Sequence, residues 1–272
     1  MVVFPNAKIN LGLNITRKRD DGFHEIESIF LPVDICDILE FVETDKTSFE
    51  STGIEIPGEP MDNLCVKAWM ILHETYKIPP VKIHLHKKIP IGAGLGGGSA
   101  DCAFMFKALN DHFQLSIPGI QLEEYSAKLG SDCPFFIKNK PAWVTGRGEK
   151  LSPIDIDLSN YKILLVNPNI HVSTKEAYSG IVPQKPMKSI LDFVANSVDT
   201  WQNEVVNDFE VSVFNKYPAI EKIKNQMLEI GAKYASMSGS GSSVYGIFDK
   251  DVIPSMEIFN DFSVFECQAT KS

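Results

Sequence analysis

The chain has 272 residues, a length that favours two compact units of ordinary domain size. Its 44% hydrophobic and 22% charged residues are typical of a folded globular protein and exclude collagen-like, low-complexity and disordered classes. The 35 acidic residues outnumber the 26 basic ones, for a net charge of −9. That charge opposes a broad surface for nucleic acid or an anionic membrane, so small molecules are the expected partners.

Cysteine usage and hydropathy indicate the compartment. The five cysteines form no C-x-x-C motif and no tight Cys/His cluster, which predicts reduced thiols. The start MVVFPNAKIN lacks the apolar segment of a signal peptide, and no run approaches the roughly 18 apolar residues that span a bilayer. We therefore expect a cytoplasmic protein, or an organellar one if a transit peptide was removed, without a membrane partner. The oligomeric state is left open between a monomer and a weak dimer.

The first predicted element is a strand over residues 7–15, where apolar and polar residues alternate. The odd-numbered positions are apolar and predict one buried face. The other face carries Lys8, Asn10, Gly12 and Asn14, an unusual set that includes a glycine able to admit a close neighbour. The alternative is an ordinary solvated face.

The remaining elements follow from apolar periodicity and from turn-forming Gly, Pro and Asp residues. We expect strands over 25–31, 38–42 and 81–85, helices over 64–72, from Ser99 to 109 and over 122–129, and two short strands within 142–151. The turn-rich stretch 152–160 predicts domains over 1–156 and 157–272. The second domain is expected to contain a strand over 162–166, helices over 173–179, 187–195 and 218–230, and strands near Ala235, Val244 and Val264. The last strand, 264–269, is a candidate to pack on the N-terminal domain.

A glycine-rich segment, PIGAGLGGGSAD from Pro90 to Asp101, is the strongest local signal. Five of the chain's 18 glycines lie between Gly92 and Gly98. Because glycine destabilises regular structure by roughly 0.5–1 kcal/mol, this density indicates positive-φ turns and backbone amides that face a ligand. The segment also leads into the N-terminus of the helix near Ser99, where the helix dipole favours an anion. It predicts a phosphate-binding loop, with a merely flexible loop as the alternative.

The class of phosphate loop is narrowed by what surrounds it. Gly92-x-Gly94-x-x-Gly97 matches the dinucleotide fingerprint, but no acidic strand end follows about 20 residues later. The Walker A ending and the V-A-I-K, H-R-D and D-F-G motifs of protein kinases are missing from the sequence. A different phosphotransfer loop is therefore expected. A nicotinamide-dependent dehydrogenase and a nucleotide-binding regulator without catalysis are the alternatives.

Charged residues near the loop suggest the rest of a phosphotransfer site. Residues 1–19 and 75–100 each contain four cationic side chains and no carboxylate, so they are either reserved for an anion or clustered by chance. Phosphoryl transfer to an alcohol needs an acceptor-side base and cations around the phosphate. Lys8 and Asp132 could supply them, although Asp132 in LGSDCPFF could also be a helix N-cap. A second glycine loop, SGSGSS over 238–243, is expected to be a tight hairpin.

Four segments in this order, PNAKINLGLNI, PIGAGLGGGSAD, LGSDCPFF and ASMSGSGSSVYGIF, resemble the GHMP small-molecule kinases. The segment DDGFHEIESIF and the GLGGGS form of the loop are similar to the branch that acts on a cytidyl diphosphate of methylerythritol. The resemblance runs nearly end to end. It implies an α+β fold of two domains, an N-terminal half like ribosomal protein S5 domain 2 and a C-terminal ferredoxin-like half, with the active site in the cleft between them.

The resemblance implies a small-molecule kinase with an alcohol acceptor. It would transfer the γ-phosphate of ATP to the 2-hydroxyl of the methylerythritol, giving the 2-phosphate and ADP, in the non-mevalonate pathway to isoprenoid precursors. A mevalonate-type or homoserine kinase is the alternative within the family. Asp132 would be the base, and Lys8 would orient it and neutralise phosphate charge. Mg²⁺ would arrive with ATP, and no protein-built metal site is expected because His84 and His86 have no evident third partner.

The resemblance also assigns the binding residues. ATP would contact Asn63, Lys87, Pro90, Ile91, Gly92, Ala93, Gly94, Leu95, Gly96, Gly97, Gly98, Ser99 and Ala100. On the acceptor side, His24 would hydrogen-bond the cytosine edge, and Phe23 and Tyr178 would stack on its ring. Asn10 and Thr174 would line the sugar and phosphate region. Phe23 stands where family members often carry Tyr, and Tyr178 where Phe is common, and stacking survives both exchanges.

Overall fold

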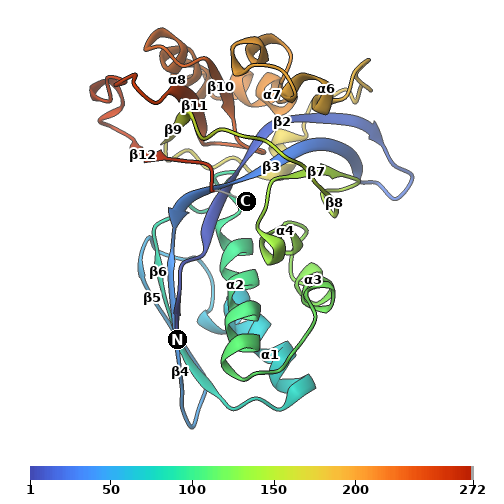
Figure 1. Cartoon of the computed structure of the whole chain (residues 1–272), viewed down its shortest axis with the longest axis vertical. Helices are drawn as coiled ribbons and strands as arrows, with labels where there is room; N and C mark the ends of the chain where they lie inside the picture. Colours follow the sequence, from blue (N-terminus) through green and yellow to red (C-terminus); the bar gives the residue numbers. More distant parts are fainter. Residues whose placement is uncertain (271–272) are drawn as a thin grey trace. The chain divides into compact units, whose positions relative to one another are not determined.

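The structure is a computed structural model that describes residues 1–270 (Figure 1). These residues form two compact units, each assembled from separate segments of the chain. Unit 1 comprises Met1–Ala7, Ile35–Ile91 and Gly96–Asn139, and unit 2 comprises Lys8–Asp34, Gly92–Leu95 and the chain from Lys140 onward. The predicted boundary near residue 157 assumes that each domain is one continuous segment, whereas both units here combine several segments. The boundary stays a prediction.

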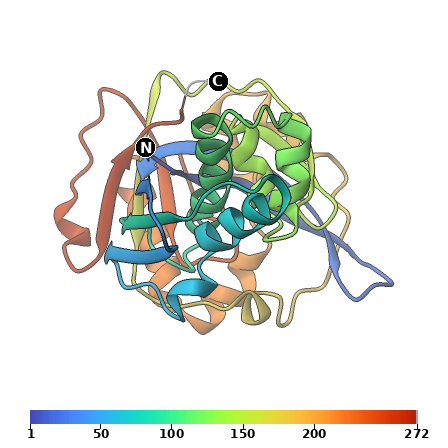
Figure 2. The same ribbon diagram turned by 90° about the horizontal axis from the view of Figure 1, so that it is seen from below.

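Unit 1 combines a mixed sheet with packed helices. Its strands lie in the order β1 (Val2–Val3), β4 (Ile38–Glu43), β6 (Val81–Lys87) and β5 (Ser48–Gly53). β5 runs parallel to β6, and the other pairs are antiparallel. Helices α1 (Leu64–Tyr76) and α2 (Gly97–His112) pack side by side (Figure 2), and α2 also contacts α3 (Gly119–Ala127) and α4 (Cys133–Lys138). A short 3₁₀ helix, Pro60–Asp62, precedes α1.

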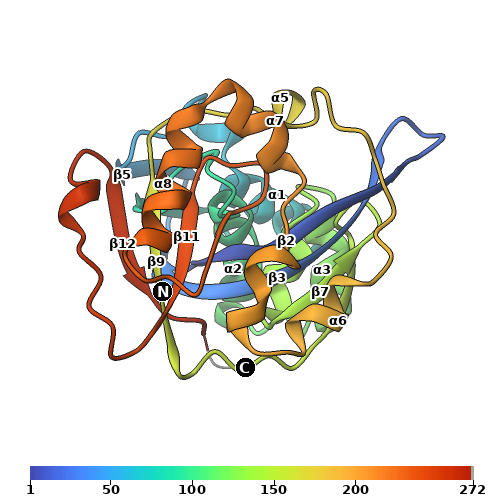
Figure 3. The same ribbon diagram turned by 90° about the horizontal axis from the view of Figure 1, so that it is seen from above.

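Unit 2 contains the other sheets, except for the first two residues of β2 and the last two of β3, which belong to unit 1. One has the order β2 (Asn6–Lys18), β3 (His24–Cys36), β7 (Ala142–Thr145) and β8 (Lys150–Pro153). The other is antiparallel, in the order β10 (Tyr234–Met237), β11 (Val244–Asp249), β9 (Tyr161–Asn167) and β12 (Ser263–Cys267). The helices are α5 (Thr174–Ala177), α6 (Ile190–Val194), α7 (Phe209–Lys216) and α8 (Pro218–Glu229), with 3₁₀ turns at Val198–Asn203 and Glu257–Phe259. Figure 3 shows α8 across the β9–β11 sheet.

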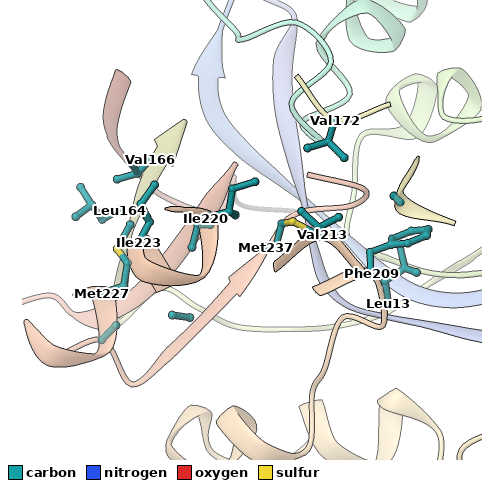
Figure 4. Close-up of a cluster of buried hydrophobic side chains, with 14 of the residues drawn as sticks. Leu13, Leu164, Val166, Val172, Phe209, Val213, Ile220, Ile223, Met227 and Met237 are labelled. Atoms are coloured by element: carbon teal, nitrogen blue, oxygen red, sulfur yellow. The ribbon is translucent and has the colours of Figure 1, made fainter. Parts of the chain in front are cut away.

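The core of unit 2 forms where α8 meets that sheet. Pro218 at the first turn has a φ suited to a helix start. Ile220, Ile223 and Met227 recur at helical spacing, and each is at most 1% exposed. They face Leu164 and Val166 of β9 in the same hydrophobic cluster (Figure 4). Burial of this stripe fixes the helix on the sheet because apolar area is removed from water on both elements.

The predicted α+β class is confirmed, as are the predicted strands and helices, with shifts of a few residues at their ends. The sequence analysis gave no element for β1, β5, α4 or α7. In α7, Phe209 and Val213 are buried four residues apart while Val211 is 70% exposed, so a helical face explains a segment whose letters alternate like a strand.

The end of the described chain has two neighbours in unit 2. β12 pairs with β9 in an antiparallel register. Beyond it, Ala269 bridges Val33 of β3, and the Asp34 amide donates to the carbonyl of Gln268. The five cysteines are free thiols. No helix within residues 1–270 combines the length and the apolarity needed to cross a membrane.

A truncation in the α8 core tests this packing. Ile223→Ala should lower the free energy of unfolding by about 2–5 kcal/mol, because it removes a fully buried side chain and leaves a cavity. Urea denaturation followed by circular dichroism measures the change. Lys222→Ala, on the exposed side of α8, should change it by no more than about 0.5 kcal/mol. Equal effects at both positions would contradict the described core.

Candidate active site

The first part of the glycine loop, Gly92–Leu95, is fixed in unit 2 through one carbonyl oxygen. The Gly94 oxygen accepts a hydrogen bond from Lys8 Nζ at 3.2 Å and another from Ser238 Oγ at 2.9 Å. Gly94 has a φ of +79°, and a Cβ at this position would overlap the carbonyl oxygen of Ser238. Glycine is therefore required here both for the backbone conformation and for the close approach.

Lys8 lies inside unit 2 and not on a solvated surface. Its side chain is 3% exposed. The ammonium donates to Asn10 Oδ1 at 2.5 Å and lies 4.5 Å from the centre of the Phe30 ring. Its backbone amide donates to the Leu95 carbonyl at 2.9 Å. The alternative of a solvated polar face on this strand is wrong, because Lys8, Asn10 and Asn14 are all buried.

Asn10 links Lys8 to the second glycine loop. Its backbone amide donates to Ser238 Oγ at 3.1 Å, and its Nδ2 donates to Ser28 Oγ at 2.8 Å. Its carbonyl accepts from the Tyr245 hydroxyl at 2.7 Å, and burial raises the pKa of that tyrosine, which keeps the hydroxyl a neutral donor. These contacts make Asn10 a fixed part of the site, and its expected contact with substrate stays a prediction.

The SGSGSS segment joins β10 to β11, so the predicted hairpin is confirmed. Asn207 Nδ2 supports it by donating to the carbonyls of Met237 at 2.7 Å and Gly239 at 2.8 Å. The Ser243 amide donates to the Ala93 carbonyl at 3.3 Å. The β10–β11 hairpin therefore packs against the first part of the glycine loop.

The second part of the glycine loop begins helix α2 in unit 1. Gly96 is the N-cap with a φ of +69°, and it has no side chain to occupy the amides of the first turn. The Ala100 amide donates to the Gly96 carbonyl and starts the helical ladder. A helix N-terminus of this kind offers backbone donors and a favourable dipole to an anion.

Lys87, expected near the nucleotide base, is 3% exposed in unit 1. Its ammonium bonds Asp37 and, at 2.7 Å, Asp101 Oδ2. Burial lowers the pKa of Lys87, but the two carboxylates outweigh that effect and raise it. Its role as a nucleotide contact stays a prediction.

Asp132 and Asn63 both lie at helix starts of unit 1. Asp132 is the N-cap residue of α4, as its alternative interpretation required, but its side chain makes no capping hydrogen bond. Ser131 Oγ donates to its Oδ1 at 3.3 Å. Asn63 caps α1, where its Oδ1 accepts from the Cys65 amide at 2.9 Å. Asp132 and Lys8 belong to different units, so their expected cooperation stays a prediction.

The expected acceptor-side residues all lie in unit 2. His24 stacks on Tyr178 with ring centres 4.6 Å apart and an angle of 19°. Phe23 is 55% exposed, with the Arg147 guanidinium 4.8 Å over its ring. Thr174 is the exposed first residue of α5. Two flat rings therefore stack in this part of unit 2, but they are His24 and Tyr178. The expected stacking of Phe23 and Tyr178 on cytosine stays a prediction.

Residues that sequence reasoning missed connect these elements. Ser28 and Ser238 complete the hydrogen bonds around Asn10, and Asp37 with Asp101 neutralises Lys87. Ser238 lay in a motif already noted, and Asp101 ended the glycine segment. No sequence pattern marked Asp37, because a single Asp between two strands is common in turns.

Within residues 1–270, no group of three or more His, Cys, Asp or Glu side chains is arranged to hold a metal ion. His84 Nε2 and His86 Nδ1 instead lie 3.1 Å and 2.9 Å from the Thr52 hydroxyl. The two histidines of β6 therefore share the hydroxyl of Thr52, a residue of the neighbouring strand β5.

Comparison with known proteins gives consistent matches. Models described as GHMP kinases N terminal domain and GHMP kinases C terminal match residues 63–140 and 190–255. A 4-diphosphocytidyl-2-C-methyl-D-erythritol kinase of Bacteroides fragilis is 51% identical over 255 residues, 92% of this chain and 93% of that protein. The protein of that name from Parabacteroides distasonis is 49% identical over 269 residues, 98% and 99% of the two chains.

Solved structures extend the comparison. A crystal structure of 4-(cytidine 5'-diphospho)-2C-methyl-D-erythritol kinase superimposes with a TM-score of 0.81 at 26% identity, covering 98% of each chain. The Methanococcus jannaschii mevalonate kinase gives a TM-score of 0.71 at 13% identity, over 100% of this chain and 98% of that one. The second match shows a shared fold alone.

The requirement for glycine at residue 94 can be tested without an activity assay. Gly94→Ala should lower the free energy of unfolding by at least about 2 kcal/mol, because the Cβ needs a strained φ and meets the Ser238 carbonyl. Gly98→Ala is the matched control: no atom lies within 4 Å of its Cβ, and alanine favours a helix by about 0.5–1 kcal/mol. Urea denaturation measures both, and a stable Gly94→Ala protein would refute the packing of the two loops.

Proposed function

Because the chain belongs to the GHMP kinases and, within them, to the 4-diphosphocytidyl-2-C-methyl-D-erythritol kinases, we propose that it phosphorylates the 2-hydroxyl of 4-diphosphocytidyl-2-C-methyl-D-erythritol with ATP. The products are ADP and the 2-phosphate. The observation that carries this proposal is 49% identity over 269 residues to a kinase of that name. A place in the non-mevalonate pathway to isoprenoid precursors follows from the substrate.

The donor side of the proposed reaction uses the glycine loop. The loop residues 90–100, together with Asn63 and Lys87, are the proposed ATP contacts. Support comes from the uncapped first turn of α2, whose amides can bind phosphate oxygens. Because Gly94 is already held by Lys8 and Ser238, the loop needs little rearrangement when phosphate binds, which is the condition for strong electrostatic stabilisation.

The chemical step needs a base and a cation. Asp132 accepts or positions the proton of the 2-hydroxyl as the new O–P bond forms and the bond from the γ-phosphorus to the bridging oxygen of ADP breaks. Lys8 neutralises charge on the transferred group. The hydrogen bonds from its ammonium to Asn10 and Gly94 support this role, because they fix the cation before substrate arrives.

The acceptor side is proposed to recognise cytosine. His24 hydrogen-bonds the base edge, Phe23 and Tyr178 offer their ring faces, and Asn10 and Thr174 line the sugar and phosphate region. The exposed ring of Phe23 and the existing His24–Tyr178 stack support a site for a planar base.

Mg²⁺ is proposed to enter with ATP, since it commonly keeps phosphate and water oxygens as ligands. When bound, the ion offsets negative charge on the phosphates. The five free thiols support a reducing, cytoplasmic setting, and the net charge of −9 supports small-molecule rather than nucleic-acid or membrane partners.

Replacement of the proposed base gives the first functional test. Asp132→Asn should lower kcat by about 10²–10⁴-fold in an ATP-consumption assay with the cytidyl substrate, because the amide cannot take the proton. Asp45→Asn, at an exposed position before β5, should retain normal turnover. The wild-type protein should also be offered mevalonate and homoserine. Turnover of one of these, without turnover of the cytidyl substrate, would contradict the proposed function.

The acceptor assignment has its own test. His24→Ala should raise KM for the cytidyl substrate by about tenfold or more, the effect of losing a hydrogen bond to a buried polar group, and leave KM for ATP nearly unchanged. His112→Ala, exposed in unit 1, is the control and should change neither constant. A rise confined to KM for ATP would remove His24 from the acceptor site.

A further inference from the structure

Unit 1 contains a buried cluster of three charged side chains close to the start of α2. Asp37, between β3 and β4, is 0% exposed, while Lys87 and Asp101 are each 3% exposed. Asp37 Oδ1 accepts from the backbone amides of Lys88 at 2.6 Å and Ile89 at 2.9 Å. One carboxylate thus fixes the two residues that lead into the glycine loop.

The same cluster reaches the other end of the loop. Lys87 Nζ donates to Asp37 Oδ2 and to Asp101 Oδ2, and Asp101 is the fifth residue of α2. A Cβ at Gly97 would come within 2.9 Å of Lys87 Nζ and of the Ile89 side chain. The end of β6 and the start of α2 are therefore in close contact through Lys87. A change in the hydrogen bonds of Lys87 would affect the backbone at both ends of the loop.

The charges of the cluster do not balance. Two carboxylates face one ammonium, and Asp101 Oδ1 is a buried oxygen for which the described residues provide no hydrogen-bond partner. Burial raises the pKa of Asp101 to about 7, the Lys87 charge opposes this rise, and the Asp37 charge adds to it. From α1, the Cys65 thiol also faces the cluster, and burial raises its pKa, so it stays neutral.

We propose that Asp101 is a positioning residue for the glycine loop and that it takes up a proton from solvent when nucleotide phosphates bind at the N-terminus of α2. Negative charge at the helix start disfavours a second negative charge on Asp101 in a low-dielectric interior. Protonation removes the negative charge of the Asp101 carboxyl group, whose Oδ1 lacks a partner among the described residues, and leaves Lys87 balanced by Asp37. The proton returns to solvent when the nucleotide leaves. This proposal rests on the proposed function.

The direction of the pH dependence follows from linkage. Binding of a proton and binding of phosphate each favour the other, so nucleotide affinity falls as the pH rises through the range where Asp101 ionises. If bound nucleotide raises the pKa of Asp101 by about one unit, affinity should weaken about fivefold between about pH 6 and about pH 8. Near neutral pH, the same shift corresponds to uptake of about 0.4 proton per nucleotide bound.

The experiment is isothermal titration calorimetry with the Mg²⁺ complex of a non-hydrolysable ATP analogue, in buffers of different ionisation enthalpy. Comparison of the buffers gives the number of protons taken up. Wild-type protein should take up more protons than Asp101→Asn, whose side chain keeps an oxygen for Lys87 but cannot ionise. Asp111→Asn, an exposed carboxylate on α2, is the control and should behave as the wild type. In steady-state assays, KM for ATP should lose its pH dependence in Asp101→Asn while the pH profile of kcat is kept.

The outcomes separate the two proposals. Equal proton uptake by the wild type and Asp101→Asn would overturn this inference and leave the proposed function standing. If wild-type protein failed to bind the analogue at all, the proposed function itself would fail. Carbon-13 NMR of the aspartate carboxyls in wild-type protein measures the same titration without a substitution. A buried aspartate whose titration moves to higher pH with analogue bound supports the inference, and absence of that movement overturns it.

Discussion

The carbonyl oxygen of Gly94 is the point on which the arrangement of unit 2 depends. It accepts from Lys8, near the start of the chain, and from Ser238, near its end. A carbonyl with two lone pairs can satisfy both donors, and it can do so here only because residue 94 is a glycine in a positive-φ conformation. The first glycine loop, the β2 strand and the β10–β11 hairpin are therefore specified together.

This constraint explains why a strand with alternating polarity is buried on both faces. The polar face of β2 is buried because its side chains are hydrogen-bonded. Lys8 and Asn10 bond to one another and to the loops. Asn10 also donates to the Ser28 hydroxyl, which donates to the Gly12 carbonyl. Gly12 itself has a φ of +62°, and a Cβ there would meet the side chains of Ile190 and Val205. A buried polar network of this kind stabilises a structure only when its members are satisfied.

The sequence was sufficient for the class of fold, for most elements and for the two glycine loops, because periodicity and glycine density are local properties. It was not sufficient for Asp37 or Ser28, whose importance comes from partners 50 and 18 residues away. The α7 helix was missed for a related reason. Tertiary packing determines which of its apolar residues are buried, and that packing cannot be read from the local sequence. The acceptor-side residues, among them His24 and Tyr178, came from the family resemblance alone, because no local pattern marks them.

The two acid-free stretches place their buried lysines in different surroundings. Each contains one deeply buried lysine, Lys8 in residues 1–19 and Lys87 in residues 75–100. Two oxygens that Lys8 bonds, on Asn10 and Gly94, orient its ammonium toward the glycine loop. Lys87 is bonded by two carboxylates, which cancel its attraction for a distant anion. The contacts of Lys8 support its proposed place beside the phosphate, and the cluster around Lys87 fixes the backbone that leads into the loop.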